Sequence, residues 1–204
     1  MLLSMNMVMI AGVNGFVGKH LARELHRHGF SVHGLGLDES PSPDIAELLS
    51  AYSACDLTSQ ALVEELDFGG ADVIFNLAGI AIASGTEEER SKYLKVNVES
   101  HTNIARTLIR QKLRPHLFSV SSGHVYQPKA TPTKESDPLV EDSTASVYVQ
   151  SKKLLEREIL GFSDQLPVTI LRPFNHIGPG QGRGFLVPDL CSQVLEALQK
   201  TSHC

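Results

Sequence analysis

Tyr148 and Lys152 are the residues whose types and spacing could do acid–base chemistry. They stand four residues apart in a segment with helical patterning, so they share one face of the predicted helix. A free tyrosine has a pKa of about 10 and is a poor proton donor or acceptor at neutral pH. A neighbouring ammonium favours the phenolate and lowers that pKa toward the working pH. The pair is therefore a candidate acid–base site, and Ser122 could hydrogen-bond the same substrate oxygen.

Taken alone, the pair could equally be a surface tyrosine and lysine on a solvated helix, which is the commoner case. The glycine-rich segment near the N-terminus favours the chemical interpretation. Gly12, Gly15 and Gly18 follow the apolar run 7–11 at G-x-x-G-x-x-G spacing. A helical face then extends to Gly29 through Val17, Leu21 and Leu25.

This segment predicts a strand, a tight turn and a helix that Gly29 can end. Gly12 allows the turn, Gly15 lets a bulky group approach the backbone, and Gly18 lets the helix pack closely on the strand. The amide groups at the helix N-terminus would then face an anion, most simply a pyrophosphate.

Strand and helix patterns alternate along the rest of the chain. Further strands are predicted at 31–37, 51–55, 71–76, 116–120 and 168–171, and helices at 59–66, 87–112, 147–162 and 187–199. The segment 127–146 is rich in Pro, Ser, Thr and acids, so we expect a loop over the site. The alternation predicts an α/β fold, a doubly wound parallel sheet of the Rossmann type with helices on both faces. Ligands of such sheets bind beyond the carboxyl ends of the strands.

Polar residues stand where several of these strands end. Asp38 lies where an acid would bind the adenosine ribose hydroxyls, and Asp56 follows the next strand. Asn76 and the turn 121–124 follow the later strands. Any one of them, taken singly, is more simply a loop cap or a turn residue. Together they surround one edge of the predicted sheet.

The composition is that of an ordinary globular protein. The 204 residues are 42% hydrophobic and 20% charged, which is enough for one substantial core. The net charge of −5 argues against nucleic acid as a partner, and no apolar stretch has the length of a membrane span. The three cysteines are scattered without disulfide or metal spacing. We therefore expect a reduced, cytoplasmic protein with no metal site.

On these residues the chain, from Met7 to about Leu195, resembles the extended short-chain dehydrogenase/reductases. That family includes NAD-dependent nucleotide-sugar epimerases, dehydratases and reductases. The glycine segment with Phe16 resembles the family's dinucleotide loop, and Ser122 with Tyr148-x-x-x-Lys152 matches its catalytic pattern. The most specific stretch is 172–181. Within the family the chain is most similar to GDP-4-keto-6-deoxymannose reductases, which share its Ser-Ser-Gly-x-Val-Tyr turn.

The resemblance implies three catalytic residues, Ser122, Tyr148 and Lys152. Together with the strand-end argument, it leads us to expect cofactor contacts from Gly12, Asn14, Gly15, Phe16, Val17, Gly18, Asp38, Asp56, Leu57, Leu77, Ala78, Gly79, Asn97, Val120, Tyr148, Lys152 and Pro173. Substrate contacts are expected from Ser121, His124 and Asn175.

The implied activity is reduction of a keto carbon on a nucleotide-linked sugar by hydride from a nicotinamide cofactor. Tyr148 would donate a proton to the keto oxygen, Ser122 would orient that oxygen, and Lys152 would hold the nicotinamide ribose and lower the pKa of Tyr148. A nucleotide-sugar 4-epimerase would use the same three residues in both directions. A non-catalytic NAD(P)-binding module and an inert fragment are the remaining alternatives.

Two departures from the family pattern qualify these expectations. Gly123-His124 stand where the family's dehydratases carry Asp-Glu, which disfavours sugar dehydration. Gly36 aligns with the usual ribose-binding acid, and Asp38 comes two positions later. Either NAD or NADP is therefore possible, with NAD slightly favoured because no arginine follows the strand to hold a 2′-phosphate.

The resemblance also predicts the domain organisation and the assembly. Residues 1–175 would form the dinucleotide-binding domain with the Ser–Tyr–Lys site. Residues 176–204 would be the incomplete start of a substrate-binding domain, because family members continue with another strand and most of that domain. A homodimer is expected through the helices around 97–112 and 147–162. In the second helix more than one apolar stripe is present, formed by Val149, Leu154, Leu155, Ile159 and Leu160.

Overall fold

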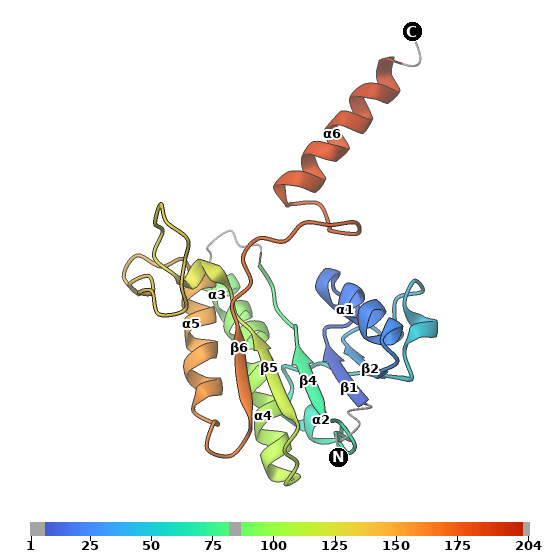
Figure 1. The fold of residues 1–204 in the computed structure, drawn as a ribbon, viewed down its shortest axis with the longest axis vertical. Helices are drawn as coiled ribbons and strands as arrows, with labels where there is room; N and C mark the ends of the chain where they lie inside the picture. Colours follow the sequence, from blue (N-terminus) through green and yellow to red (C-terminus); the bar gives the residue numbers. More distant parts are fainter. Residues whose placement is uncertain (1–6, 82–86, 202–204) are drawn as a thin grey trace. The chain divides into compact units, whose positions relative to one another are not determined.

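Six parallel strands form one sheet in the order β3-β2-β1-β4-β5-β6 (Figure 1). The computed structural model describes residues 7–81 and 87–201. The strands are β1 (Met7–Ala11), β2 (Ser31–Gly36), β3 (Ala51–Ala54), β4 (Val73–Asn76), β5 (His116–Val120) and β6 (Val168–Leu171). This order confirms the predicted doubly wound parallel sheet. The order in which strands are added to the sheet reverses between β1 and β4, which is where sheets of this kind bind their ligands.

Helices and short helical turns connect the strands. They are α1 (Phe16–Arg27), η1 (Ala46–Leu48), α2 (Gln60–Glu64), α3 (Glu87–Leu94), η2 (Lys95–Glu99), α4 (Ser100–Arg110), η3 (Gly123–Val125), α5 (Val147–Leu160) and α6 (Leu186–Thr201). The predicted helix 87–112 is thus continuous but contains a π-helical turn, η2, between α3 and α4. Such turns occur preferentially at functional sites, because they shift the side chains that follow.

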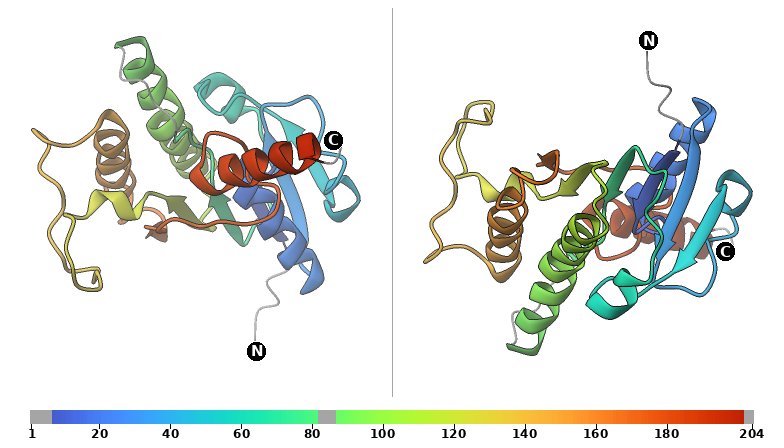
Figure 2. Two further views of the ribbon diagram at one scale, coloured as in Figure 1. Left: turned by 90° about the horizontal axis from the view of Figure 1, so that it is seen from above. Right: turned by 90° about the horizontal axis from the view of Figure 1, so that it is seen from below.

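Apolar side chains fill both faces of the sheet. Met9 belongs to the cluster that α4 and α5 cover, whereas its neighbours Val8 and Ile10 belong to the cluster that α1 covers. Figure 2 shows α1 on one side of the sheet, and α4 and α5 on the other. Strands buried on both faces lack polar alternation, which explains the continuous apolar runs in the sequence.

Helix α1 packs on the sheet through a different line of residues from the one predicted. Gly18 and Ala22 are buried, and Leu21 and Leu25 pack against the β1–β2 face. Val17 is 39% exposed, so its predicted place on the buried face is wrong. The helix comes closest to the sheet at Gly18 and Ala22, each one position after Val17 and Leu21. The helix ends at His28, and Gly29 follows with a φ of 81°, as predicted.

The apolar residues of α5 are used by the chain's own core. Val149, Leu155 and Ile159 are buried, and Leu154 packs against the same cluster. Only Leu160 of this set is strongly exposed, at 50%. The apolar excess that motivated the dimer therefore has an explanation within one chain, and the homodimer stays a prediction.

The structure divides into two compact units, Met1–Phe174 and Asn175–Cys204. The second unit carries α6, on which Leu190, Val194 and Leu198 recur at four-residue spacing with half or more of their surface exposed. Across 7–81 and 87–201, no helix combines the length and apolarity that a membrane crossing requires.

The contact between α1 and the glycine loop leads to a first prediction. A Cβ added at Gly18 would lie 2.4 Å from the Gly12 carbonyl oxygen and 2.7 Å from the Val13 Cα. These are backbone atoms, so α1 must move to admit even a methyl group. Gly18→Ala should lower the free energy of unfolding by about 1–3 kcal/mol, measured by urea denaturation. Gly182→Ala is the control, because no atom lies within 4 Å of its added Cβ. Equal stability of both variants would contradict the close packing.

Candidate active site

The glycine loop and the end of β4 lie against each other at the carboxyl edge of the sheet. Gly12 has a φ of +80°, and a Cβ there would lie 3.1 Å from the Ala78 amide nitrogen and 3.2 Å from the Leu77 carbonyl carbon. Glycine is needed for both the backbone conformation and the approach. Gly15 precedes α1, and no side chain caps the first turn of that helix. The amide groups at the N-terminus of a helix suit an anionic ligand.

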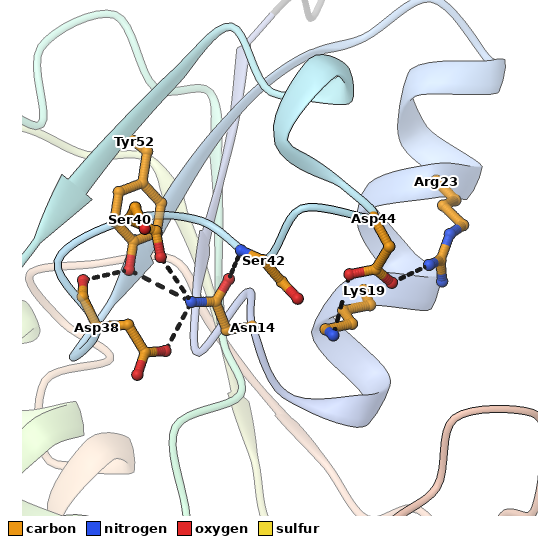
Figure 3. A network of polar contacts seen from close by, with 8 residues as sticks. All are labelled: Asn14, Lys19, Arg23, Asp38, Ser40, Ser42, Asp44 and Tyr52. Carbon is orange, nitrogen blue, oxygen red and sulfur yellow. Dashed lines mark hydrogen bonds and ion pairs between the residues drawn. The ribbon is translucent and has the colours of Figure 1, made fainter.

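Asn14 ties the glycine loop to the loop that follows β2 (Figure 3). Its Nδ2 donates to the Asp38 carboxylate at 2.7 Å, and its Oδ1 accepts from the Ser42 amide at 2.9 Å. The Tyr52 hydroxyl donates to the Asp38 carbonyl oxygen at 2.7 Å. Asp38 remains exposed, so its carboxylate is held in place at the surface beside the glycine loop.

Tyr52 occupies the space that a side chain at position 36 would need. A Cβ added at Gly36 would lie 2.6 Å from the Tyr52 hydroxyl oxygen. Burial, with the Asp38 charge as a smaller cause, raises the pKa of Tyr52 and keeps the hydroxyl protonated. This explains why the acid stands at Asp38 and not at position 36. Sequence reasoning missed Tyr52, because only strand pairing places it beside β2.

Two cations at the start of α1 are held by a carboxylate from the same loop. The Lys19 ammonium lies 3.1 Å from Asp44 Oδ1, and Arg23 pairs with the other oxygen (Figure 3). A hydrogen bond from Ser42, followed by the one from Lys19, lowers the pKa of Asp44 to about 2. Both cations therefore already have an anionic partner.

Asp56 and Leu57 form a turn after β3. Asp56 Oδ1 accepts from the Thr58 amide at 2.9 Å and from the Thr58 hydroxyl at 2.8 Å. Leu57 is buried, and its carbonyl oxygen accepts from Asn103 of α4 at 3.0 Å. Asp56 is exposed and follows β3 directly after Cys55.

Lys152 is buried at the end of β5. It is 4% exposed, and its Nζ donates to the Val120 carbonyl oxygen at 2.8 Å. Burial lowers its pKa to about 8, with the Glu156 carboxylate opposing this effect. The side chain is therefore largely an ammonium at neutral pH. Tyr148 lies one helical turn earlier on α5, half-buried, with its ring edge-on to Tyr93 at 6.2 Å.

Ser122 lies in the turn between β5 and η3. Its hydroxyl oxygen accepts from the His124 amide at 3.2 Å, and the residue is 4% exposed. His124 itself is exposed. The Pro173 carbonyl oxygen accepts from the Gly123 amide at 2.8 Å, so the segment after β6 lies against this turn. Val120, Ser122 and Pro173 thus lie near one another at the ends of β5 and β6.

Asn97 stands in the π-helical turn and links two sides of the site. Its Oδ1 accepts from the Ile80 amide at 2.8 Å, while its Nδ2 donates to the Ile80 carbonyl at 3.1 Å and to the Ser151 hydroxyl at 3.0 Å. A Cβ at Gly79 would lie 3.2 Å from Asn97 Oδ1 and 3.3 Å from Lys152 Nζ. The segment after β4 is therefore fixed directly beside the lysine.

His101 is a buried neighbour of this site that sequence reasoning missed. Its Nε2 donates to the Ala78 carbonyl oxygen at 2.9 Å, and the residue is fully buried. Burial, with the Lys152 charge as the next cause, lowers its pKa to about 3. The imidazole is therefore neutral at physiological pH. In the sequence, only its position one helical turn after Asn97 could have indicated that His101 lies beside the site.

Two predicted substrate residues require comment. The Ser121 hydroxyl points inward and donates to Glu156 at 2.5 Å, and the residue is 2% exposed. Its hydroxyl is thus already engaged within the chain, and its role as a substrate contact stays a prediction. Asn175 belongs to the second unit, so its role stays a prediction.

The comparison with known families agrees with this geometry. The model of the NAD dependent epimerase/dehydratase family matches residues 8–202. The chain belongs to this family. As a family member, it has the glycine loop and the Ser–Tyr–Lys trio within the matched region.

Two curated relatives differ in the reactions that their names describe. The UDP-N-acetyl-alpha-D-glucosaminuronate decarboxylase of Bacillus cytotoxicus is 29% identical over 188 residues, 84% of this chain and 54% of the relative. The GDP-6-deoxy-D-mannose reductase of Pseudomonas aeruginosa is 27% identical over 192 residues, 93% of this chain and 59% of the relative. The chain thus spans a little more than half the length of these relatives.

A solved structure shows the same fold with ligands. MoeE5 in complex with UDP-glucose and NAD superposes with a TM-score of 0.73 and is 27% identical. The match covers 87% of this chain and 57% of MoeE5.

The buried histidine leads to a second prediction. The unfolded chain binds a proton on His101 near pH 6.5, whereas the folded chain binds it only near pH 3. The stability that the folded chain has with a neutral His101 is therefore fully present above pH 6.5. It is lost as the pH falls toward 3, because the unfolded chain then binds a proton that the folded chain does not. Relative to the parent, His101→Gln should lose less stability on acidification, by up to about 1.4 kcal/mol per pH unit. Urea denaturation between pH 7.5 and 4.5 measures the difference, and parallel curves would show that His101 is not buried in its neutral form.

Proposed function

We propose that this chain binds NAD across the carboxyl ends of β1, β2, β4 and β5, and that its Ser–Tyr–Lys site acts on a nucleotide-linked sugar. The observation that carries the proposal is the buried Lys152 ammonium. It stands beside Gly79, one turn from Tyr148, and on the same sheet edge as the glycine loop. Membership of the family and the NAD complex of MoeE5 support this assignment.

The residues present fit a dinucleotide. Gly12 and Gly15 place no side chain at either end of the loop, and the first turn of α1 has no side-chain cap. A pyrophosphate would accept hydrogen bonds from the amide groups of this turn. Gly12 and Gly15, with the edge formed by Leu77, Ala78 and Gly79, would hold the cofactor.

The loop after β2 favours NAD over NADP. The Asp38 carboxylate is fixed by Asn14, and an acid at this position would accept hydrogen bonds from the ribose hydroxyls. The same carboxylate would repel a 2′-phosphate. Lys19 and Arg23 carry positive charges that could offset this repulsion, but both are already paired with Asp44.

In the proposed reaction each residue has one task. The cofactor would supply hydride to a keto carbon. Tyr148 would donate its hydroxyl proton to the keto oxygen, and Ser122 would donate a hydrogen bond to the same oxygen. The Lys152 ammonium would stabilise the tyrosinate that remains, because opposite charges attract strongly in a site with little water.

Reduction of a GDP-linked 4-keto-6-deoxy sugar is the reaction that we favour. The Ser-Ser-Gly-x-Val-Tyr turn at 121–126 and the Pseudomonas aeruginosa relative support it. Gly123-His124 offer no acid pair for sugar dehydration. A 4-epimerase would use the same trio, and the range of sugars accepted would separate the two activities.

The third prediction tests the cofactor site. Gly15 has a φ of −70°, and an added Cβ would approach only the Gly12 carbonyl oxygen, at 3.1 Å. A side chain there should be tolerated by the fold but should exclude the pyrophosphate. Gly15→Val should weaken NADH binding by at least about 100-fold in calorimetry, which corresponds to about 2.7 kcal/mol. NADPH should bind the parent more weakly than NADH.

Gly161→Val is the matched control for this experiment. Its added Cβ also meets a single close carbonyl oxygen, that of Glu158 at 3.2 Å, but at the far end of α5 from Tyr148. This variant should bind NADH like the parent. Parental affinity in Gly15→Val would show that the cofactor binds elsewhere.

The fourth prediction tests the chemistry. Tyr148→Phe should reduce turnover of a GDP-linked 4-keto-6-deoxy sugar with NADH by about 100-fold or more, because the proton donor is lost. NADH affinity should change less than about threefold. Tyr93→Phe is the control, since it removes a hydroxyl from the neighbouring ring. NADH binding without turnover in the parent would favour a non-catalytic module.

A further inference from the structure

A partly buried ion pair joins α5 to the end of β6 close to the proposed catalytic residues. Arg172 donates to Glu156 through one edge of its guanidinium, from Nε to Oε1 at 2.8 Å and from Nη2 to Oε2 at 2.6 Å. Glu156 is 4% exposed. This bidentate geometry fixes the orientation of both side chains as well as their distance.

Two more side chains complete the network. The Ser121 hydroxyl donates to Glu156 Oε1 at 2.5 Å, and Arg172 Nη1 donates to the Tyr126 hydroxyl at 2.8 Å. The guanidinium carbon also lies 4.9 Å from the centre of the Tyr126 ring. The Tyr126 ring in turn stacks on Phe174 with nearly parallel planes. Every member of the network therefore has a partner.

Three members of the network stand next to, or one helical turn from, a residue of the proposed site. Ser121 precedes Ser122, Glu156 follows Lys152 by one helical turn, and Arg172 precedes Pro173. Backbone hydrogen bonds already join the ends of β5 and β6, from Ser121 to Leu171 at 2.7 Å and from Gly123 to Pro173 at 2.8 Å. Among the residues that the structure describes, no backbone hydrogen bond joins α5 to these strand ends, and side chains make the polar connection.

Glu156 connects α5 to the ends of β5 and β6, and its carboxylate takes no direct part in the proposed reaction. The other connections to the helix at this level come from Lys152 itself and from Ser151, which pairs with Asn97. The carboxylate also acts on Lys152 electrostatically. It raises the lysine pKa against the effect of burial, while His101 faces the lysine from α4 and remains neutral.

We propose that Glu156 is the positioning residue of this site. Held by Arg172 and Ser121, it sets Tyr148 and Lys152 in register with Ser122 and keeps the lysine protonated. The proposal deepens the proposed function, on which its catalytic part rests. It gives Ser121 and Arg172 a role that the strand-end argument did not assign.

The first test measures the lysine directly and needs no ligand. The sample is cofactor-free protein with 13C-labelled lysine, and an NMR titration gives the pH at the midpoint of Lys152 deprotonation. The Lys152 signal is assigned because it is missing in the Lys152→Arg variant. Glu156→Gln should lower this midpoint by at least about 0.5 pH unit, because the opposing carboxylate is gone. Glu64→Gln is the control, since it breaks a similar arginine pair, Arg110–Glu64 at 2.6 Å, between α2 and α4. An unchanged midpoint in Glu156→Gln would overturn the electrostatic role.

A double variant covers the case in which Glu156→Gln does not fold. Glu156→Gln/Arg172→Gln removes both charges, so no arginine is left buried and unpaired. The lysine midpoint should again be lower than in the parent. A midpoint equal to that of the parent would count against the proposal as clearly as in the single variant.

The second test measures positioning. Glu156→Gln should lower kcat by at least about tenfold while the KM for NADH stays within about threefold, because alignment of the reacting groups is lost and cofactor contacts remain. Ser121→Ala, which keeps the ion pair, should lower kcat less. Equal losses of kcat in Glu156→Gln and Glu64→Gln would show a merely structural role. If the parent neither binds NADH nor turns over, the proposed function fails, and the ligand-free titration still decides the inference.

Discussion

The burial of the Lys152 ammonium is the constraint on which most of the site depends. A charge removed from water is unstable unless polar groups replace its hydration. Here the Val120 carbonyl oxygen and the Glu156 carboxylate do so. Glu156 is itself buried and needs Arg172 and Ser121. One charge thus requires a chain of partners from α5 through the ends of β5 and β6.

The other half of the site depends on close backbone approach and not on charge. Gly12 allows the loop to touch the end of β4, and Gly18 allows α1 to touch the loop. Asn14 then fixes the loop after β2. Because all six strands are parallel, both halves lie at the same edge of the sheet. A dinucleotide that spans this edge could contact both halves at once.

The relatives suggest how such a scaffold is used. One is named as a decarboxylase and another as a reductase, yet both match this chain over 84% or more of its length. The shared part therefore cannot by itself specify the reaction, as is general for widely used folds. In this chain the turn that carries Ser122, Gly123 and His124 is the part of the described site on which the proposed reaction rests. Reduction is the proposal that this turn supports.

Local spacing in the sequence was enough to predict the sheet, the glycine loop and the Tyr148–Lys152 pair. Strand and helix periods depend on near neighbours, and residues four apart on a helix share a face whatever surrounds them. The rule that parallel strands end at one edge also led to the expectation that Asp38, Asp56, Asn76 and the turn 121–124 surround that edge. The π-helical turn at Asn97 was not predictable, since it depends on contacts with Ile80 and Ser151.

Only the tertiary structure decided which side chains meet across the sheet. Tyr52 fills the space beside Gly36 because β3 pairs with β2 in one register, and a shift of one residue would turn it away. Glu156 meets Arg172 and Ser121 over sequence separations of 16 and 35 residues. No local pattern encodes such pairs. They follow from packing, which determines the direction of each side chain, and this is why Ser121 faces the interior.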